Sequence, residues 1–181
     1  MLTCGSTEHV VTEFGCRQRL CVSGGIFVYS VGMKFTSTSL DETKHIAFEL
    51  VKNLERGEGA VVIALEGDLG AGKTTFSQFV GEALGVHEAI QSPTFLIEKI
   101  YELFRQPWRH LIHIDAYRLD SPQELLSLGW SEITAKPDNI ILVEWADKVR
   151  QILPKSAIHI VFTHADETTR EIEVKEEADT P

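Results

Sequence analysis

Residues 67–74 read Gly-Asp-Leu-Gly-Ala-Gly-Lys-Thr, and this run constrains the fold more than any other part of the sequence. It fits the pattern G-x-x-x-x-G-K-[ST], which forms a phosphate-binding loop where it follows a strand and opens a helix. The apolar run 61–65 precedes it, and apolar residues at helical spacing follow from Thr75 to Leu84. A glycine-rich turn before a helix is the plainer alternative. The context favours a strand, loop and helix unit that binds a nucleoside triphosphate.

The residue types in this run explain how such a loop holds phosphate. Its glycines let the backbone adopt positive φ and bring N–H groups close to phosphate oxygens, while the helix N-terminus adds roughly half a positive charge. Lys73 would reach the β- and γ-phosphates, and the Thr74 hydroxyl would take one coordination position on Mg²⁺. The residues expected to contact the nucleotide here are Asp68, Leu69, Gly70, Ala71, Gly72, Lys73, Thr74 and Thr75.

Length and charge narrow the class of protein. A chain of 181 residues with 43% hydrophobic content makes one ordinary globular domain, and a domain of this size buries about two-thirds of its surface. The 27 acidic and 17 basic residues give a net charge of -10, which repels nucleic acid over most of the surface. Any involvement of RNA should therefore be indirect. The sequence shows neither a membrane span nor a signal peptide, so we expect a cytoplasmic protein.

The first 32 residues differ from the rest of the chain. They contain all three cysteines, Cys4, Cys16 and Cys21, and show no sustained helical or strand period. The cysteine number and spacing favour reduced thiols over a disulfide framework or a metal site. We expect residues 1–32 to be a disordered extension, or a stretch ahead of a true start at Met33, and residues 33–181 to form the nucleotide-binding domain.

The remaining pattern predicts an α/β fold like that of the P-loop NTPases. Ser39 and Glu42 form the S-x-x-E capping box of a helix that runs to about Leu54, behind a short strand at 34–36. Strands are expected at 111–115 and 140–144, and an antiparallel hairpin of 157–163 with 170–174 is expected at the sheet edge. These elements predict a three-layer sandwich with a mixed, mostly parallel sheet and an antiparallel C-terminal hairpin.

Two acids follow the central strands directly. Asp115 ends the run Leu-Ile-His-Ile, and Glu144 ends the run Ile-Ile-Leu-Val. Ligands of open parallel sheets lie beyond the carboxyl ends of the strands, so both acids point toward the phosphates. Asp115 is placed to hold Mg²⁺ directly or through water, and Glu144 to hold a metal-bound water or to orient and deprotonate the attacking one. Their roles are exchangeable, and a solvated or helix-capping acid is the plainer alternative for each.

Three residues near these acids are candidate sensors of the nucleotide. Thr94 lies in a turn after a proline, where its hydroxyl would sense the γ-phosphate or the metal, unless it is an ordinary turn hydroxyl. Tyr117 and Arg118 follow Asp115 directly, and they would contact phosphate or a partner if Arg118 is not simply paired at the surface.

Three ring side chains beside the acids allow more than one interpretation. Trp145 follows Glu144 and would either stack on the base or pack in the core, which is the commoner fate of tryptophan. His110 and His113 lie near Asp115, but a histidine inside an apolar strand is more often a hydrogen-bonded core residue than a catalyst. The sequence gives no chemical role to either histidine.

Four blocks of the sequence together resemble the TsaE family, the small ATPases of bacterial tRNA threonylcarbamoyladenosine synthesis. The resemblance runs from about Lys34 to about Val174 and leaves residues 1–32 outside. The order and spacing of the blocks are more specific than the phosphate loop alone. The blocks are Gly67-Asp68-Leu69-Gly70-Ala71-Gly72-Lys73-Thr74-Thr75-Phe76, Ser92-Pro93-Thr94-Phe95, His113-Ile114-Asp115-Ala116-Tyr117-Arg118-Leu119 and Val143-Glu144-Trp145-Ala146-Asp147.

This resemblance implies a subunit that binds ATP with Mg²⁺, hydrolyses it slowly and docks on the TsaD and TsaB pair, which transfers the threonylcarbamoyl group. Hydrolysis would reset that pair between turnovers, so tRNA carries the pathway's product and is only an indirect partner. In such proteins the matched Lys73 and Thr74 serve phosphate and metal, and Glu144 is a metal and catalytic residue. The nucleotide would also be approached from the first helix, which Ser39 caps, and from Arg170.

Other classes of P-loop protein remain as alternatives. A kinase of a small hydroxylated substrate would use Arg118 as a donor-side arginine, although no lid-like arginine cluster is evident. A GTPase would need an N-K-x-D motif, and a transporter ATPase would need a glycine-rich signature after the loop; the sequence has neither. A non-hydrolysing nucleotide-dependent interaction module would need only the same loop and Mg²⁺ ligands.

Overall fold

Strands and helices alternate along most of the chain. A computed structural model describes residues 33–93, 96–166 and 168–175, so the prediction made for residues 1–32 lies outside the described residues. The elements are β1 (Lys34–Ser37), α1 (Leu40–Lys52), β2 (Val61–Gly67), α2 (Lys73–Ala83), β3 (Glu98–Glu102), β4 (His110–Asp115), the short 3₁₀ helix η1 (Ala116–Arg118), α3 (Pro122–Ser127), α4 (Trp130–Thr134), β5 (Asn139–Glu144), the 3₁₀ helix η2 (Ala146–Ile152), β6 (Ile158–His164) and β7 (Arg170–Lys175).

The strands form one mixed sheet in the order β1-β7-β6-β2-β5-β4-β3. The four central strands β6, β2, β5 and β4 run parallel to one another, while β3, β7 and β1 pair antiparallel with their neighbours. This confirms the predicted mixed, mostly parallel sheet with an antiparallel C-terminal hairpin. The hairpin β6–β7 is not the edge of the sheet, however, because β1 pairs with β7 from Lys34↔Glu173 to Ser37↔Arg170. The short β1 thus covers the backbone groups that β7 would otherwise expose.

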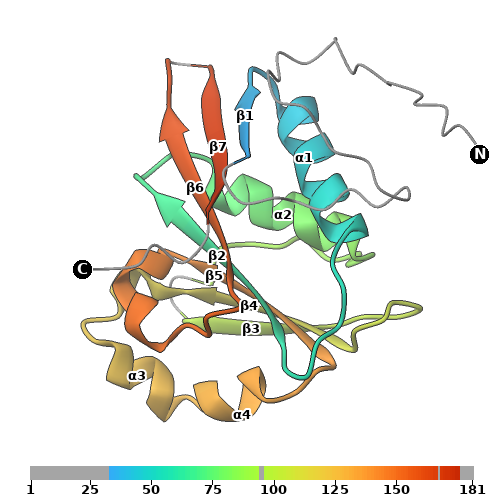
Figure 1. The fold of residues 1–181 in the computed structure, drawn as a ribbon, viewed down its shortest axis with the longest axis vertical. Helices are drawn as coiled ribbons and strands as arrows, with labels where there is room; N and C mark the ends of the chain where they lie inside the picture. The colour runs from blue at the N-terminus through green and yellow to red at the C-terminus, as the bar shows by residue number, and fades with distance from the viewer. Residues whose placement is uncertain (1–32, 94–95, 167, 176–181) are drawn as a thin grey trace, which may run out of the picture.

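Helices cover both faces of the sheet, which gives three layers. Figure 1 shows α1 and α2 on one side of the sheet and α3 and α4 on the other. Because side chains alternate along a strand, Ile63 and Leu65 of β2 pack with α1 and α2, whereas Val62 and Ala64 face α3, α4 and η2. A central strand buried on both faces reads as a continuous apolar run, as the 61–65 segment does.

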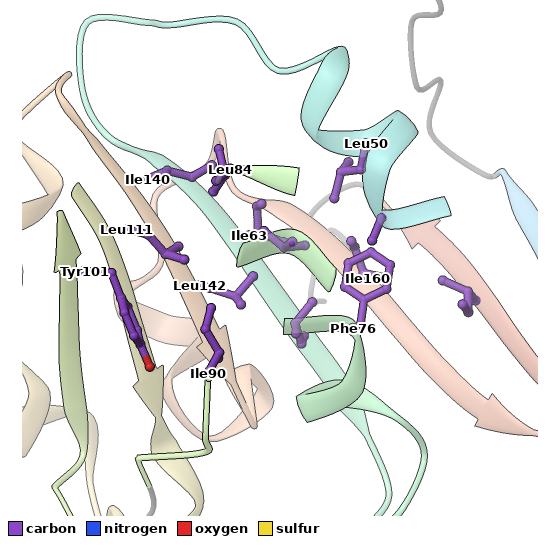
Figure 2. Close-up of a cluster of buried hydrophobic side chains, with 14 of the residues drawn as sticks. Leu50, Ile63, Phe76, Leu84, Ile90, Tyr101, Leu111, Ile140, Leu142 and Ile160 are labelled. Carbon is purple, nitrogen blue, oxygen red and sulfur yellow. The ribbon is translucent and has the colours of Figure 1, made fainter. Parts of the chain in front are cut away.

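The core beneath α1 and α2 holds the phosphate-loop helix on the sheet. Figure 2 shows Leu50 of α1, Phe76 of α2 and Leu84, the C-cap residue of α2, gathered over strand residues that include Ile63. The rings of Phe76 and Phe162 meet edge to face, with centroids 5.3 Å apart. Burying each such side chain contributes about 1.5–3 kcal/mol relative to leaving it exposed. This packing fixes where α2 begins, and therefore where the loop before it ends.

The helix ends differ in detail from the sequence prediction. The Ser39 hydroxyl accepts the N–H of Glu42 at 3.2 Å, as the capping box requires. The Glu42 carboxylate, however, accepts the N–H of Thr38 at 2.6 Å, one residue before the cap, so the reciprocal half of the box is shifted. The helix ends at Lys52 with Asn53 as its C-cap, close to the predicted end at about Leu54.

Within the part of the chain that the structure describes, no helix is both long and apolar enough to cross a membrane.

Candidate functional site

The loop between β2 and α2 has the backbone that its glycines allow. Gly67 has φ 136°, and a Cβ there would lie 2.3 Å from the backbone oxygen of Phe162 on the neighbouring strand. Gly72, with φ 106°, is the N-cap of α2 and gives the helix no side-chain cap. The predicted strand, loop and helix are therefore present in that order, and the first amides of α2 have no capping side chain to compete with an anion.

Lys73, the first residue of α2, curls back over the loop. Its Nζ donates to the carbonyl oxygens of Gly67 at 2.7 Å and Asp68 at 2.8 Å. It also lies 3.7 Å from the centre of the Trp145 ring, a cation–π contact. Burial lowers the pKa of Lys73 from its ordinary value, and nearby carboxylates, Glu144 first, oppose that change. The lysine is thus a desolvated cation held at the mouth of the loop.

Glu144, the last residue of β5, is surrounded by hydrogen-bond donors. It is 1% exposed. The Thr74 hydroxyl donates to Oε2 at 2.7 Å, and the Ser77 hydroxyl lies 2.8 Å from Oε1. The ring Nε2 of His113 lies 2.8 Å from the same Oε1. Glu144 therefore links β5 to the first two turns of α2 and to β4.

Asp115 ends β4 directly beside Glu144, since the two residues are partners in the β4–β5 register. Its Oδ1 accepts the N–H of Tyr117 at 2.9 Å, which caps η1, and Ser92 Oγ donates to its Oδ2. The plainer alternative, a helix-capping acid, is thus present in the structure. The prediction that both acids lie together at the carboxyl ends of parallel strands agrees with this register.

The predicted metal donors form no all-protein cage. Among the described residues, no group of three or more His, Cys, Asp or Glu side chains could hold a metal ion. Mg²⁺ is commonly held by only one or two carboxylates together with waters and substrate phosphates. The Thr74 hydroxyl and the carboxylates of Glu144 and Asp115 fit that kind of donor set.

A cavity of about 310 Å³ opens beside the loop. The start of α1, the loop, β6 and β7 surround it, and Ser37 and Thr43 share a hydrogen bond of 2.7 Å at its wall. Arg170 reaches it from the start of β7, where its guanidinium donates to the carbonyl oxygens of Asp166 and Thr169. The lining residues are Ser37, Thr38, Ser39, Leu40, Thr43, Gly70, Ala71, Gly72, Thr75, Phe162, Thr168, Arg170 and Ile172.

The cavity brings six of the predicted nucleotide-contacting residues together from three separate parts of the sequence. They are Ser39, Gly70, Ala71, Gly72, Thr75 and Arg170. Lys73 and Thr74 lie on the Glu144 side of the loop, while Asp68 is exposed and Leu69 is 78% exposed at its tip.

Trp145 does not line the cavity. Its ring packs against Lys73 and Tyr117, whose ring centre is 5.0 Å away, so the structure favours packing over base stacking. Its backbone has φ 57°, an uncommon conformation for a bulky residue, directly after Glu144. Tyr117 and Arg118 are exposed on η1, and Thr94 lies outside the described residues.

The contacts of two further residues with Glu144 were not predicted, although each has a local signal in the sequence. His113 was expected to be a hydrogen-bonded core residue, and the structure confirms this. Ser77 stands four residues after Lys73, on the same face of a helix. His113 stands two residues before Asp115, on the same face of a strand. The apolar wall of the cavity, Phe162 and Ile172, gave no separate signal, because both read as ordinary strand residues.

Comparisons with known proteins agree with this arrangement. The family model described as "Threonylcarbamoyl adenosine biosynthesis protein TsaE" matches residues 37–172. Similar relatives are the tRNA threonylcarbamoyladenosine biosynthesis protein TsaE of Nostoc sp., 39% identical over 74% of this chain and 80% of the relative, and that of Bacillus subtilis, 38% identical over 77% and 83%.

A solved structure is also similar. The crystal structure of Bacillus subtilis YdiB superimposes with a TM-score of 0.64 and 31% identity, over 81% of this chain and 86% of that one. The family model, the relatives and this fold agree, and the chain therefore belongs to the TsaE family of tRNA threonylcarbamoyladenosine biosynthesis, with a P-loop nucleotide-binding fold.

Proposed function

We propose that this chain binds ATP with Mg²⁺ and hydrolyses it slowly, and that hydrolysis resets the TsaD–TsaB transferase pair between turnovers. The observation that carries the proposal is the 2.7 Å hydrogen bond from Thr74 to Glu144, which joins the phosphate loop to the acid at the end of β5. A threonine hydroxyl can donate its proton to a carboxylate while its oxygen lone pairs face a cation. The bond is therefore compatible with the predicted metal role of Thr74.

In this proposal the loop binds one part of the nucleotide and the cavity binds the other. The phosphates lie on the loop amides, and the nucleoside lies in the cavity between Ser39 and Arg170. The N–H groups of Lys73 that now donate to Gly67 and Asp68 are the donors for which β- and γ-phosphate oxygens compete. The Trp145 ring faces the Lys73 ammonium, with Nζ 3.7 Å from the ring centre, and restricts the approach of water from that side.

Hydrolysis asks mainly for charge neutralisation and a positioned water. Bound Mg²⁺, held by Thr74, Glu144 and Asp115 directly or through water, would neutralise charge on the β- and γ-phosphates. Water attacks the γ-phosphorus, and the bond to the β–γ bridging oxygen breaks to leave ADP and inorganic phosphate. Glu144 or Asp115 orients that water and accepts its proton.

The proposed protein partners follow from membership of the TsaE family and from the net negative charge of the chain. The pathway modifies tRNA, but a chain with net charge -10 has little basis for a phosphate-backbone footprint. We therefore infer that tRNA meets the partner pair and not this chain. The place of action is the cytoplasm.

The deciding experiment measures steady-state phosphate release from ATP by the full chain, alone and with cognate TsaD and TsaB, beside a Glu144→Ala variant. Slow release that changes when the pair is added, and that the variant lacks, is the expected result. Bound ATP with no phosphate released after long incubation would favour a non-hydrolysing interaction module. Fast release that is indifferent to the pair and to Glu144 would refute the proposal and favour a kinase of a small hydroxylated substrate.

A further inference from the structure

We propose that His113 is a positioning residue for Glu144. Its ring holds Oε1 of the Glu144 carboxylate, so that Oε2 faces Thr74 and the phosphate loop. The inference rests on the proposed ATPase function and assigns a task to a side chain that lies outside the loop and the cavity. It starts from the alternation of side chains along β4. His113 and Asp115 share one face of that strand with Leu111. Leu111 packs in the core with residues of α1 and α2, so these two helices cover that face.

The two oxygens of Glu144 have different surroundings. Oε2 accepts the Thr74 hydroxyl at 2.7 Å, and Oε1 lies 2.8 Å from both Ser77 Oγ and His113 Nε2. Ser77 has a single hydroxyl proton, and its oxygen also lies 3.0 Å from the Lys73 carbonyl oxygen, so that proton is shared between two acceptors. His113 is then the one donor among the described residues that is committed to Oε1.

The other ring nitrogen of His113 supports a role beyond packing. His113 is fully buried, and its Nδ1 has no hydrogen-bond partner among the described residues. A buried polar atom without a partner lowers stability, and each such atom in a native structure calls for an explanation. An apolar side chain would avoid this penalty but would leave Oε1 with only the shared Ser77 proton. The hydrogen-bond network thus assigns the proton to Nε2, and the bare Nδ1 follows from that assignment.

Loss of His113 should free the carboxylate of Glu144 to rotate. Partners that orient a metal ligand typically change metal affinity or activity by about 10- to 100-fold when removed. We expect His113→Leu to lower the single-turnover rate of ATP hydrolysis by about that factor. In His113→Gln the amide N–H can take the place of Nε2–H, so this variant should recover most of the rate.

The test compares His113→Leu and His113→Gln with His110→Leu, a control in the same strand whose ring contacts Asn139 and not Glu144. Besides the single-turnover rate, it uses calorimetric titration with ADP in EDTA and in Mg²⁺. For His113→Leu we expect ADP affinity within twofold of wild type in EDTA and a reduced gain in affinity on adding Mg²⁺. In a Glu144→Gln background, His113→Leu should cause no further loss of rate.

Two results would overturn the assignment. One is a His113→Leu protein with the wild-type rate and the wild-type Mg²⁺-dependent gain. The other is equal loss of ADP affinity in EDTA for the leucine and glutamine variants, with a lowered melting temperature, which would mark His113 as structural only. If wild type itself releases no phosphate, the ATPase proposal fails, but the Mg²⁺-linked binding of ADP still decides the role of His113.

Discussion

A buried ion cluster anchors the strand that leads into the phosphate loop. Glu66 immediately precedes Gly67, and its side chain lies on the face of the sheet away from α2. Its Oε1 lies 2.9 Å from Nδ1 of His159 on β6, and the guanidinium of Arg150 on η2 donates to its Oε2. Only 6% of Glu66 is exposed. The carboxylate therefore ties the end of β2 to the two elements beside it, and its removal should be measurable in stability.

Substituting Glu66→Gln keeps the shape of the side chain and removes its charge. Breaking a buried ion pair from one side typically costs about 3–5 kcal/mol, because the remaining partner stays buried without a counter-charge. Arg150 is 40% exposed and can turn toward water, so a discounted loss of about 2–3 kcal/mol in the free energy of unfolding is expected at pH 7.

The pH dependence of this loss has a definite sign. Burial raises the pKa of Glu66, but the hydrogen bond from His159 and the charge of Arg150 outweigh it, so the folded pKa lies below the ordinary value of 4.5. A carboxyl with a depressed pKa stabilises the fold fully above its unfolded pKa and loses that contribution as pH falls through the folded value. The difference between wild type and Glu66→Gln should be constant above about pH 5.5 and shrink below pH 4.5.

Urea unfolding followed by tryptophan fluorescence, from pH 7 down to pH 3, measures this difference directly. Glu58→Gln, at an exposed glutamate in the loop before β2, is the matched control and should match wild type. A Glu66→Gln loss below about 0.5 kcal/mol at pH 7 would refute the assignment of a buried ion pair. A loss that stays the same at pH 7 and at pH 3 would show that packing, and not charge, produced it.

Three further substitutions test the fold and the nucleotide site. Phe76→Ala should lower the free energy of unfolding by about 3–5 kcal/mol in urea, because Phe76 is fully buried against Phe162; a loss under 1 kcal/mol would contradict that packing. Gly67→Ala should destabilise by about 1–3 kcal/mol or more, since its Cβ would meet the Phe162 backbone oxygen, and a melting temperature equal to wild type would show that the strands can separate there. Arg170→Ala should weaken ATP binding about 10-fold in calorimetry with little change in stability, as for a lost charged contact of about 1.4 kcal/mol; unchanged affinity would remove Arg170 from the site.

The loop and the two acids could be predicted from the sequence because their signals are local. The glycines and Lys73 lie within one short run, and each acid follows its own apolar strand without a break. The fold class required only that both acids lie at the carboxyl ends of parallel strands, and the structure adds the register that sets Asp115 opposite Glu144. Local patterns and the expectation of parallel strands were enough to place these groups at one edge of the sheet.

The cavity wall could not be predicted in the same way, because it depends on a pairing of distant segments. β1 and β7 are separated by more than half of the sequence, and four residue pairs form the contact between them. This pairing places Ser37, which bonds locally to Thr43, opposite Arg170. No period within residues 34–37 distinguishes an edge strand bound to β7 from one bound elsewhere, so the hairpin was wrongly expected to form the edge itself.

Glu144 and the phosphate loop differ in how firmly the surrounding structure holds them. Glu144 is held from a helix by Thr74 and from a neighbouring strand by His113, in the buried middle of the molecule. Among the described residues, the Lys73 ammonium donates hydrogen bonds to the loop's own carbonyl oxygens, and Leu69 at the loop tip is 78% exposed. We therefore expect phosphate that competes for the Lys73 donors to rearrange the loop and to leave Glu144 in place. A carboxylate that is already held in position can stabilise the charge that develops during phosphoryl transfer. A loop that can rearrange admits the substrate, so the two together suit a nucleotide-hydrolysing site.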